Sequence, residues 1–400
     1  MELSTRPDIY DGAFPAFAQP TQVGAYKLDS QRNVSPIVVS NDNNHSRCYC
    51  DLYLRDFEPK SSLPPNFDLN VGFSAEEFAR QRASSATVGP IEELLQWHKM
   101  TTKQTAQQST KDSFYGADIV CFRGLLTRIA GAPFQQREDW MFEATSYDGV
   151  IFLRERETDA QKRRNASVDD VQQLRFMYYG YKFERYMTEQ AGCSGERDEE
   201  SVDVDERLKG AHVVNANEQC CVVFRSKLNA RRLLYAAEVD GVDRKNGKLV
   251  ELKTSRLVDN QRQLDNFHRF KSIKWWLQSF LVGIDQIVAG YRDDDGVVKK
   301  LDRLRVSQLP AQQNFWAANV CMNFLDRVLT VVSEMLESAP QNACSGVVSS
   351  NCDESERSTN DDRVSGPTLS VVFQPETRLV HFRTLTPTEQ QPFLARKYFA

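Results

Sequence analysis

The feature that most constrains the fold is a pair of apolar runs that carry charged residues near the turn between them. The runs are LLYAAEVDGV (233–242) and KLVELKTS (248–255), and the tripeptide at 245–247 is Lys-Asn-Gly. Short runs of Leu, Val and Ala that flank an Asn-Gly turn are typical of a β-hairpin. The sequence therefore predicts two antiparallel strands with acids at their inner ends.

Three carboxylates and one ammonium group converge in this predicted hairpin. Side chains two residues apart in a strand project to the same face, so Glu238 lies beside Asp240, and Glu251 lies beside Lys253. Like charges at this distance repel unless a cation neutralises them. Oxygen ligands without Cys or His favour Mg²⁺ or Mn²⁺. The four residues are therefore candidate catalytic groups, and the three acids are candidate metal ligands.

The chemistry that suits such a cluster is phosphodiester hydrolysis. Two divalent ions held about 3.5–4 Å apart can bind the attacking water and the leaving oxygen. Lys253 could orient that water, help to deprotonate it or stabilise charge on the phosphorus. PD-(D/E)xK nucleases use this carboxylate-x-lysine arrangement. The alternative is a surface hairpin with ordinary Glu–Lys pairs across its strands.

A further carboxylate lies where it could complete the site. Glu184 follows Tyr181 by three residues in the predicted helix 168–188, and so lies beside the apolar side of that helix. A carboxylate in such a position usually needs a buried partner, such as a metal ion. The alternative is a pair with Lys182 or Arg185.

Basic and amide side chains could bind phosphate. Arg123 lies between apolar runs in IVCFRGLLTR and could hold a phosphate with two hydrogen bonds, or form a structural ion pair. Lys271, Lys274 and Gln278 share one face of the predicted helix 262–282. That face could contact phosphates, although a solvated basic face is the alternative.

The remaining pattern predicts one mixed α/β (α+β) domain, with a central, largely antiparallel β-sheet flanked by helices. Residues 1–75 are expected to be irregular and packed on the core, and 76–400 to form the main domain. The other predicted helices lie at 91–100 and 319–337, and the other predicted strands at 140–145, 150–157, 220–228, 287–292, 297–304, 369–373 and 378–385.

The net charge of −5 does not exclude an anionic substrate, because the charge is unevenly distributed. Residues 189–206 hold eight acids and one arginine, and the rest of the chain carries +2. This acidic stretch and the polar stretch 338–366 are expected to be disordered loops. No apolar run approaches the roughly 18–20 residues of a membrane span, and the first residues lack the order of a signal peptide. We therefore expect an intracellular protein without a membrane partner.

Ordered motifs along most of the chain resemble the DXO family of RNA decapping nucleases, which includes the fungal partner of the nuclear 5′–3′ exoribonuclease. In chain order they are YDGAFPAFAQPTQVGAYKLDSQR, PNFDL, CFRGLLT, MYYGYKFERYM, EVDGVD, ELKTSR, KWWLQSFLVGIDQIVAGYRDDDG and VCMNF. The resemblance implies a PD-(D/E)xK-like core and a nuclease domain at 76–400. The stretches 189–206 and 338–366 look longer than is typical of the family.

The family's motifs, matched residue by residue, imply the roles of individual positions. The implied metal ligands are Glu184, Glu238, Asp240, Glu251 and the main-chain carbonyl of Leu252, for two Mg²⁺ or Mn²⁺ ions. The implied catalytic residues are Glu238, Asp240, Glu251 and Lys253. The implied substrate contacts are Arg32, Arg123, Cys221 (through its main chain), Glu238, Lys253 and Gln278.

The resemblance also implies the activity. Family members hydrolyse NAD caps, incomplete guanosine caps and triphosphates at RNA 5′ ends, and some then degrade the RNA 5′ to 3′. NAD would be part of the substrate and not a cofactor. A nuclear exoribonuclease is an implied partner, and the implied location is the nucleus, with the cytoplasm also compatible.

Two alternatives remain open from the sequence. One is a non-catalytic adaptor that stabilises a nuclear 5′–3′ exoribonuclease; some relatives have lost the acids, whereas this chain keeps each of them. The other is a DNA endonuclease of the broader superfamily.

Overall fold

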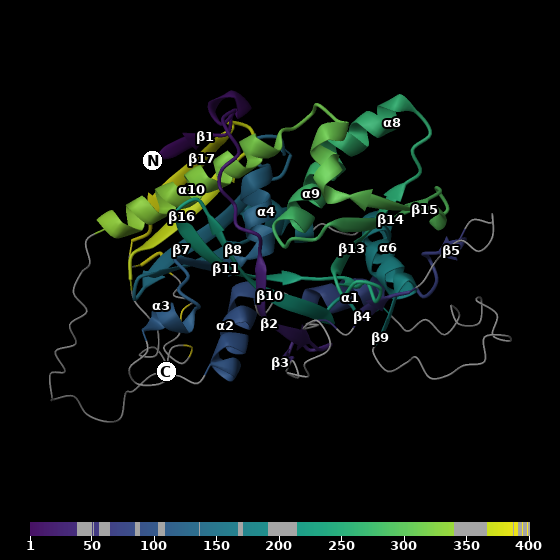
Figure 1. The fold of residues 1–400 in the computed structure, drawn as a ribbon, viewed down its shortest axis with the longest axis horizontal. Helices are drawn as coiled ribbons and strands as arrows, with labels where there is room; N and C mark the ends of the chain where they lie inside the picture. The colour runs from purple at the N-terminus through teal and green to yellow at the C-terminus, as the bar shows by residue number, and fades with distance from the viewer. Residues whose placement is uncertain are drawn as a thin grey trace.

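The computed structural model describes residues 1–37, 50, 52–55, 65–84, 89–102, 109–135, 137–166, 171–190, 214–339, 366–386, 388–390, 394 and 398. Their strands form two mixed sheets, and helices pack against both (Figure 1). Most of 189–206 and nearly all of 338–366 lie outside the described residues, so their disorder stays a prediction. No described helix is both long and apolar enough to cross a bilayer.

The larger sheet has ten strands. In spatial order they are β1 (Glu2–Ser4), β17 (Leu379–Thr384), β16 (Thr368–Gln374), β7 (Trp140–Tyr147), β8 (Val150–Arg156), β6 (Ile119–Phe122), β11 (Arg231–Glu238), β10 (Gln219–Leu228), β2 (Thr21–Leu28) and β3 (Val34–Pro36). β6 runs parallel to β8 and β11, and the other neighbours are antiparallel. The predicted strands at 140–145, 150–157, 369–373 and 378–385 are confirmed, and they pair as the antiparallel hairpins β7–β8 and β16–β17.

The smaller sheet has seven strands. In spatial order they are β5 (Phe67–Asp68), β15 (Val297–Arg305), β14 (Gln286–Arg292), β13 (Leu249–Arg256), β12 (Gly241–Val242), β4 (Leu52–Leu54) and β9 (Thr188–Gln190). β13 is parallel to β14, and β12 is parallel to β4. The predicted class of mixed, largely antiparallel sheet with flanking helices is confirmed, although two sheets share the strands.

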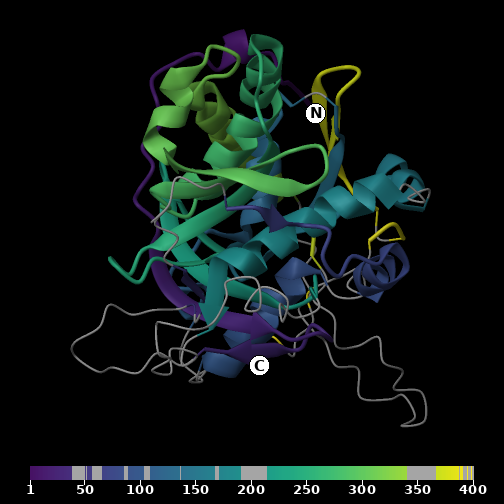
Figure 2. The same cartoon turned by 90° about the vertical axis from the view of Figure 1, so that its right-hand side faces the viewer.

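Helices lie against these sheets in both views (Figures 1 and 2). In chain order they are α1 (Ala75–Ser84), α2 (Pro90–Thr101), α3 (Thr110–Ser113), α4 (Arg123–Gly131), α5 (Asp159–Ala166), α6 (Val171–Met187), α8 (Gln261–Asn266), α9 (Ile273–Phe280) and α10 (Ala318–Ser338). Short 3₁₀ helices span Pro7–Ile9 and Val306–Gln312. The predicted helices at 91–100 and 319–337 are confirmed, as is the described part of 168–188.

Side chains that alternate along β10 fill two separate cores. Val222 and Phe224 belong to the core that includes residues of α4, α9 and α10. Cys221 and Val223 belong to the opposite core, beneath α2. Because both faces are buried, the strand reads as a continuous apolar run instead of an alternating one.

A third core joins α6 to the smaller sheet. Tyr178 and Phe183 of α6 pack with Leu252 of β13 and Val288 of β14. The helix lies so close to β14 that a Cβ atom at Gly290 would be 2.5 Å from the ring of Phe183. This packing fixes the position of α6 over β13.

The predicted hairpin at 233–255 is wrong over most of its length. β11 ends at Glu238, the chain leaves the larger sheet, and β12 pairs with β13 only through Gly241↔Val250 and Val242↔Leu249. β11 cannot continue beside β13, because β6 and β10 occupy both of its edges.

Two further expectations are corrected. Within 1–75, the segment 21–28 is not irregular but forms β2, which pairs with β10 along seven residue positions. The predicted continuous helix 262–282 is interrupted by a π-helical segment, Phe267–Ser272, between α8 and α9. A strand that must pair inside a sheet, and a turn with one extra residue, leave little trace in hydrophobic periodicity.

Candidate active site between the two sheets

Three of the predicted charged residues meet where the chain crosses between the sheets. Lys253 Nζ lies 2.5 Å from Glu251 Oε1 and 3.9 Å from Asp240 Oδ2. Asp240 Oδ2 also accepts a 2.6 Å hydrogen bond from the main-chain N–H of Leu252. The side chains of Glu251 and Asp240 are only 2% and 9% exposed. The acids and the lysine therefore lie together as predicted. They do so because the chain passes from the larger to the smaller sheet after Glu238, and not because of the predicted hairpin.

Four carboxyl groups, those of Glu184, Glu238, Asp240 and Glu251, surround Lys253 closely enough for their charges to shift pKa values within the cluster. Burial raises the pKa of Glu184 well above its usual value, and repulsion from Asp240 and Glu238 raises it further. Burial also raises the pKa of Glu238, and it raises that of Asp240 to about 7 with a contribution from Glu251. Burial alone would lower the pKa of Lys253, but Glu251 and Asp240 outweigh it and raise that pKa. One ammonium group therefore cannot neutralise the cluster.

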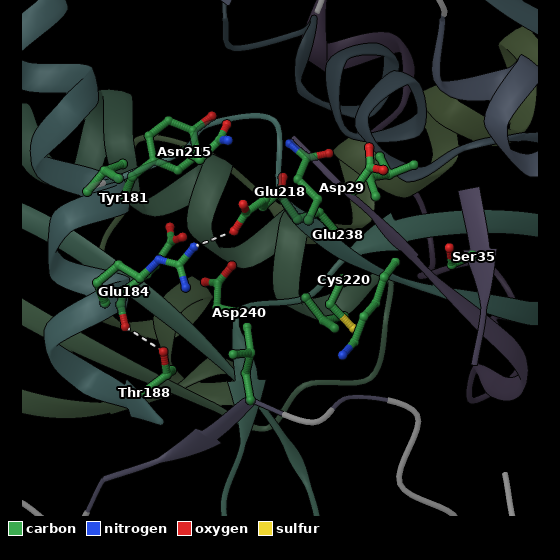
Figure 3. A pocket seen from close by; sticks show the side chains of 17 residues that line it. Asp29, Ser35, Tyr181, Glu184, Thr188, Asn215, Glu218, Cys220, Glu238 and Asp240 are labelled. Atoms are coloured by element: carbon green, nitrogen blue, oxygen red, sulfur yellow. Dashed lines mark hydrogen bonds and ion pairs between the residues drawn. The ribbon is translucent and has the colours of Figure 1, made fainter. Parts of the chain in front are cut away.

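A cavity of about 330 Å³ opens beside three of these acids, Glu184, Glu238 and Asp240 (Figure 3). Its other walls include Asp29 from the N-terminal segment and Glu218, which pairs with Arg185 at 3.0 Å. Cavities of this size accommodate small molecules or parts of larger ones. The acids therefore stand at the wall of a space that could receive part of a substrate.

Arg123 begins α4 directly after β6 and points toward the end of β11. Its Nη2 donates a 3.1 Å hydrogen bond to the main-chain oxygen of Glu238. Its Nε and Nη1 are buried without a partner among the described residues. A buried guanidinium group with two free donors is costly unless an anion binds it. The group is therefore suited to a phosphate.

Arg32 forms a buried ion pair that the sequence does not predict. Its Nε and Nη2 donate to Glu93 Oε1 over 2.8 and 2.5 Å. Glu93 lies on α2, has no exposed surface, and its other oxygen has no partner among the described residues. Burial raises the pKa of Glu93 to about 7, although Arg32 lowers it. Arg32 has a φ of +61°, a strained value for a non-glycine residue, which the pair helps to hold.

Of the six predicted substrate contacts, Glu238 lines the cavity, and five lie outside its lining: Arg32, Arg123, Lys253, Cys221 and Gln278. Cys221 is fully buried beneath α2, opposite Tyr26 in β2 and Glu238 in β11, while its neighbour Cys220 lines the cavity. Gln278 is half-buried on α9. Their predicted roles, and that of the Leu252 carbonyl, stay predictions.

Comparison with known proteins places the chain in a family. Residues 18–369 match the sequence profile of the family described as RAI1 like PD-(D/E)XK nuclease. The chain belongs to this family. It is 31% identical over 346 residues to the decapping and exoribonuclease protein of Xenopus laevis, a match that covers 84% of this chain and 80% of the relative.

Solved structures of Rai1 proteins share the fold of this RAI1-like nuclease. The Scheffersomyces stipitis Rai1 structure in complex with (3'-NADP)+ and calcium ion has a TM-score of 0.68 at 21% identity, and covers 97% of this chain and 94% of that one. The Candida albicans Rai1 structure in complex with pU5-Mn2+ has a TM-score of 0.66 at 20% identity, with the same coverage. The predicted family and its nuclease fold are therefore confirmed.

The donor set of this RAI1-like nuclease fits a hard divalent cation. Its acids offer only oxygen, and Glu251 Oε2 is buried without a hydrogen-bond partner among the described residues. As they stand, no three His, Cys, Asp or Glu side chains in the described part of the chain are arranged to hold a metal ion. Lys253 instead contacts Glu251 and Asp240, so ion binding requires these side chains to turn toward the cation.

Sequence reasoning missed Glu93 in this RAI1-like nuclease. The available signal was weak: Glu93 precedes Trp97 by four residues, on the side of α2 that is buried. The helix pattern gave no reason to join it to Arg32, which lies 61 residues earlier in the chain.

Proposed function

We propose that this protein is a metal-dependent nuclease that hydrolyses NAD caps, incomplete guanosine caps and triphosphates at RNA 5′ ends. The observation that carries the proposal is the cluster of buried carboxylates around Lys253, at the wall of a cavity, in a chain of the RAI1-like nuclease family. Such a cluster suits phosphate hydrolysis, because its excess negative charge calls for divalent cations.

Each acid has a part in the proposed site. Glu184, Glu238, Asp240 and Glu251 hold Mg²⁺ or Mn²⁺, together with the main-chain carbonyl of Leu252. When bound, the ions supply Lewis acidity and lower the pKa of bound water. Lys253, whose raised pKa keeps it protonated, orients the water and stabilises negative charge on the phosphate.

The substrate is held by groups on both sides of this cluster. Arg123 offers two unused donors to a phosphate oxygen pair, close to Glu238. Arg32, Cys221 and Gln278 complete the contacts to the RNA 5′ end. The cavity beside Glu184 receives part of the 5′-terminal group that is released. The ligands of the two Rai1 structures, (3'-NADP)+ with calcium and pU5 with manganese, support a nucleotide and a cation here.

The test uses NAD-capped RNA labelled at its 5′ end. We expect the wild type to release NAD with Mn²⁺ and not with EDTA, and Glu238→Gln/Asp240→Asn to release none above background. Glu334→Gln on α10, whose side chain is 59% exposed, is the matched control and keeps full activity. Equal release by the wild type and the double variant would overturn the proposal.

We extend the proposal to the setting of the reaction. A 5′–3′ exoribonuclease activity is supported by the name of the Xenopus laevis relative. A nuclear location, with a cytoplasmic pool, and a nuclear 5′–3′ exoribonuclease as partner rest on the family resemblance. Fractionation of cells and purification of the tagged protein test both points. The adaptor alternative requires that the protein binds this partner yet releases nothing from any 5′ end.

A further inference from the structure

Two adjoining cavities lined by basic side chains lie near the end of β13 and the first half of α6. One, of about 530 Å³, lies beside the π-helical segment, and the other, of about 690 Å³, lies against the first half of α6. They share Arg256. Among the described residues, their cations are Arg137, Arg175, Arg256, Arg262, Lys271 and Arg292, and the one acid in their lining is Asp294. We call these seven residues and Phe176 the basic band.

Most of this charge is not neutralised by acids among the described residues. Arg256 pairs with Asp294 at 2.7 Å. Lys271 donates instead to Ser255 Oγ at 3.1 Å, and Arg137 lies over the Phe270 ring at 4.0 Å. Desolvation in the cavity wall, and then nearby Arg292, lower the pKa of Lys271. A concave surface of this kind concentrates anions.

The π-helical segment explains why Lys271 belongs to the band. One extra residue in a helix turns everything after it by about 100°. Lys271 therefore faces Ser255 on β13, while Lys274 turns away to Glu138 at 3.4 Å. π-helical turns often accompany functional sites.

An exposed aromatic ring lies in the same band. Phe176 is 46% exposed and lies 4.7 Å from the Arg292 guanidinium, measured from its ring centroid. Exposed rings among cations are the means by which proteins bind single-stranded nucleic acid: the rings stack on bases, and the cations contact phosphates. An anionic metabolite without an aromatic ring would use the cations but not the exposed ring.

The band is continuous with the candidate active site along two elements. On β13, Ser255 accepts the hydrogen bond from Lys271 and lines one of the two cavities, and it follows Lys253 by two residues, or about 7 Å, on the same face of the strand. On α6, Phe176 precedes Glu184 by eight residues, or about 12 Å. The 330 Å³ cavity adjoins the other end of α6, at 181–188. The acids therefore lie between a cavity for the 5′-terminal group and the band.

We propose that the basic band binds the RNA chain on the 3′ side of the hydrolysed linkage, a few nucleotides from it. The proposal rests on the proposed function and adds to it the path of the RNA. It makes activity depend on RNA length, because a substrate too short to reach the band loses those contacts.

The first test measures binding without hydrolysis. The probe is a 5′-monophosphorylated RNA of ten uridines with a 3′ fluorescein, in EDTA. We expect Arg262→Gln/Lys271→Gln to lose about tenfold or more in affinity, and its slope of log affinity against log salt to fall by about 0.7 per lost contact. Phe176→Ala loses roughly five- to hundredfold with an unchanged slope, because stacking is not ionic. Arg383→Gln/Lys111→Gln, far from the band, is the control and binds as the wild type does.

The second test separates this proposal from the proposed function. Rates are compared on NAD-capped RNA of two and of ten nucleotides. We expect the wild type to prefer the longer substrate and Arg262→Gln/Lys271→Gln to lose that preference. Suppose that the wild type cleaves both substrates and that the variants keep its length preference and its salt slope. That result overturns the proposal for the basic band and leaves the proposed function standing. A wild type that cleaves neither substrate overturns the proposed function. In that case the binding measurement in EDTA still shows whether the basic band binds RNA.

Discussion

Arg32 and Glu93 join through a single carboxylate oxygen, so that the other oxygen of Glu93 is buried without a partner in the described part of the chain. The pair ties the turn before β3 to α2. It also places a second buried carboxylate near Glu238, since repulsion from Glu238 contributes to the raised pKa of Glu93. This relationship leads to a prediction about stability and pH.

Glu93 makes the folded protein less stable as pH rises. Its pKa is about 7 in the folded state against an ordinary 4.5, so the folded state binds this proton more tightly. The raised pKa of Glu93 contributes roughly 3 kcal/mol to the free energy of unfolding below pH 4.5. This contribution is lost as the pH rises from about 4.5 to 7. Urea unfolding at pH 5 and pH 8 measures it, against Glu93→Gln. Parallel pH profiles for the two proteins would contradict the assignment.

Divalent cations should stabilise the fold independently of catalysis. Binding at 100 times the dissociation constant adds about 2.7 kcal/mol to the free energy of unfolding. We expect Mn²⁺ to raise the Tm of the wild type and to have a much smaller effect on Asp240→Asn or Glu251→Gln. A Tm shift of equal size in wild type and variants would mean that these acids are not the ligands.

Arg123 should contribute both to the fold and to substrate binding. Arg123→Met removes two donors that are buried without a partner among the described residues, but it also removes the hydrogen bond to the main-chain oxygen of Glu238 and the cation that lowers the pKa of Glu238. We therefore expect the free energy of unfolding to fall by roughly 1–3 kcal/mol in EDTA. The loss of charge-assisted hydrogen bonds to phosphate lowers kcat/KM by roughly ten- to hundredfold per bond. Urea unfolding and kinetics on NAD-capped RNA test the two effects separately. A destabilised variant with full kcat/KM would mean that Arg123 has a structural role only.

Two glycines offer a matched pair of substitutions near α6. Gly290→Ala places a methyl group 2.5 Å from the Phe183 ring, next to Glu184, and should cost about 1–3 kcal/mol and reduce activity. Gly180→Ala, within α6, meets nothing within 4 Å and should stabilise the helix by about 1 kcal/mol. Thermal unfolding and activity of both variants decide the matter; equal effects would show that packing of α6 against β14 does not position Glu184.

Local patterns were enough to predict which acids gather, but not how they do so. Glu238, Asp240 and Glu251 are close in sequence and embedded in apolar runs, and Glu184 lies beside an apolar helix side. They still converge although the predicted hairpin is wrong, because the chain enters the neighbouring sheet at Gly241, three residues after Glu238.

Features that depend on distant segments could not be predicted. β2 is a strand because β10 offers it an edge, and its own sequence lies among proline-rich neighbours. The Arg32–Glu93 pair and the basic band join residues from elements that only the folded chain brings together. The π-helical segment adds one residue to a turn, a change that hydrophobic periodicity does not resolve.

The crossing at Glu238 gives the site a mechanical property. Glu238 lies at the end of β11 in the larger sheet, while Glu251 lies on β13 of the smaller sheet and Glu184 on α6, which packs against that sheet. A shift of the sheets by an ångström would change the spacing between these acids, whereas a shift within either sheet would not. We therefore expect a cation bound by all of these acids to link the two sheets, so that metal binding makes the whole molecule more rigid.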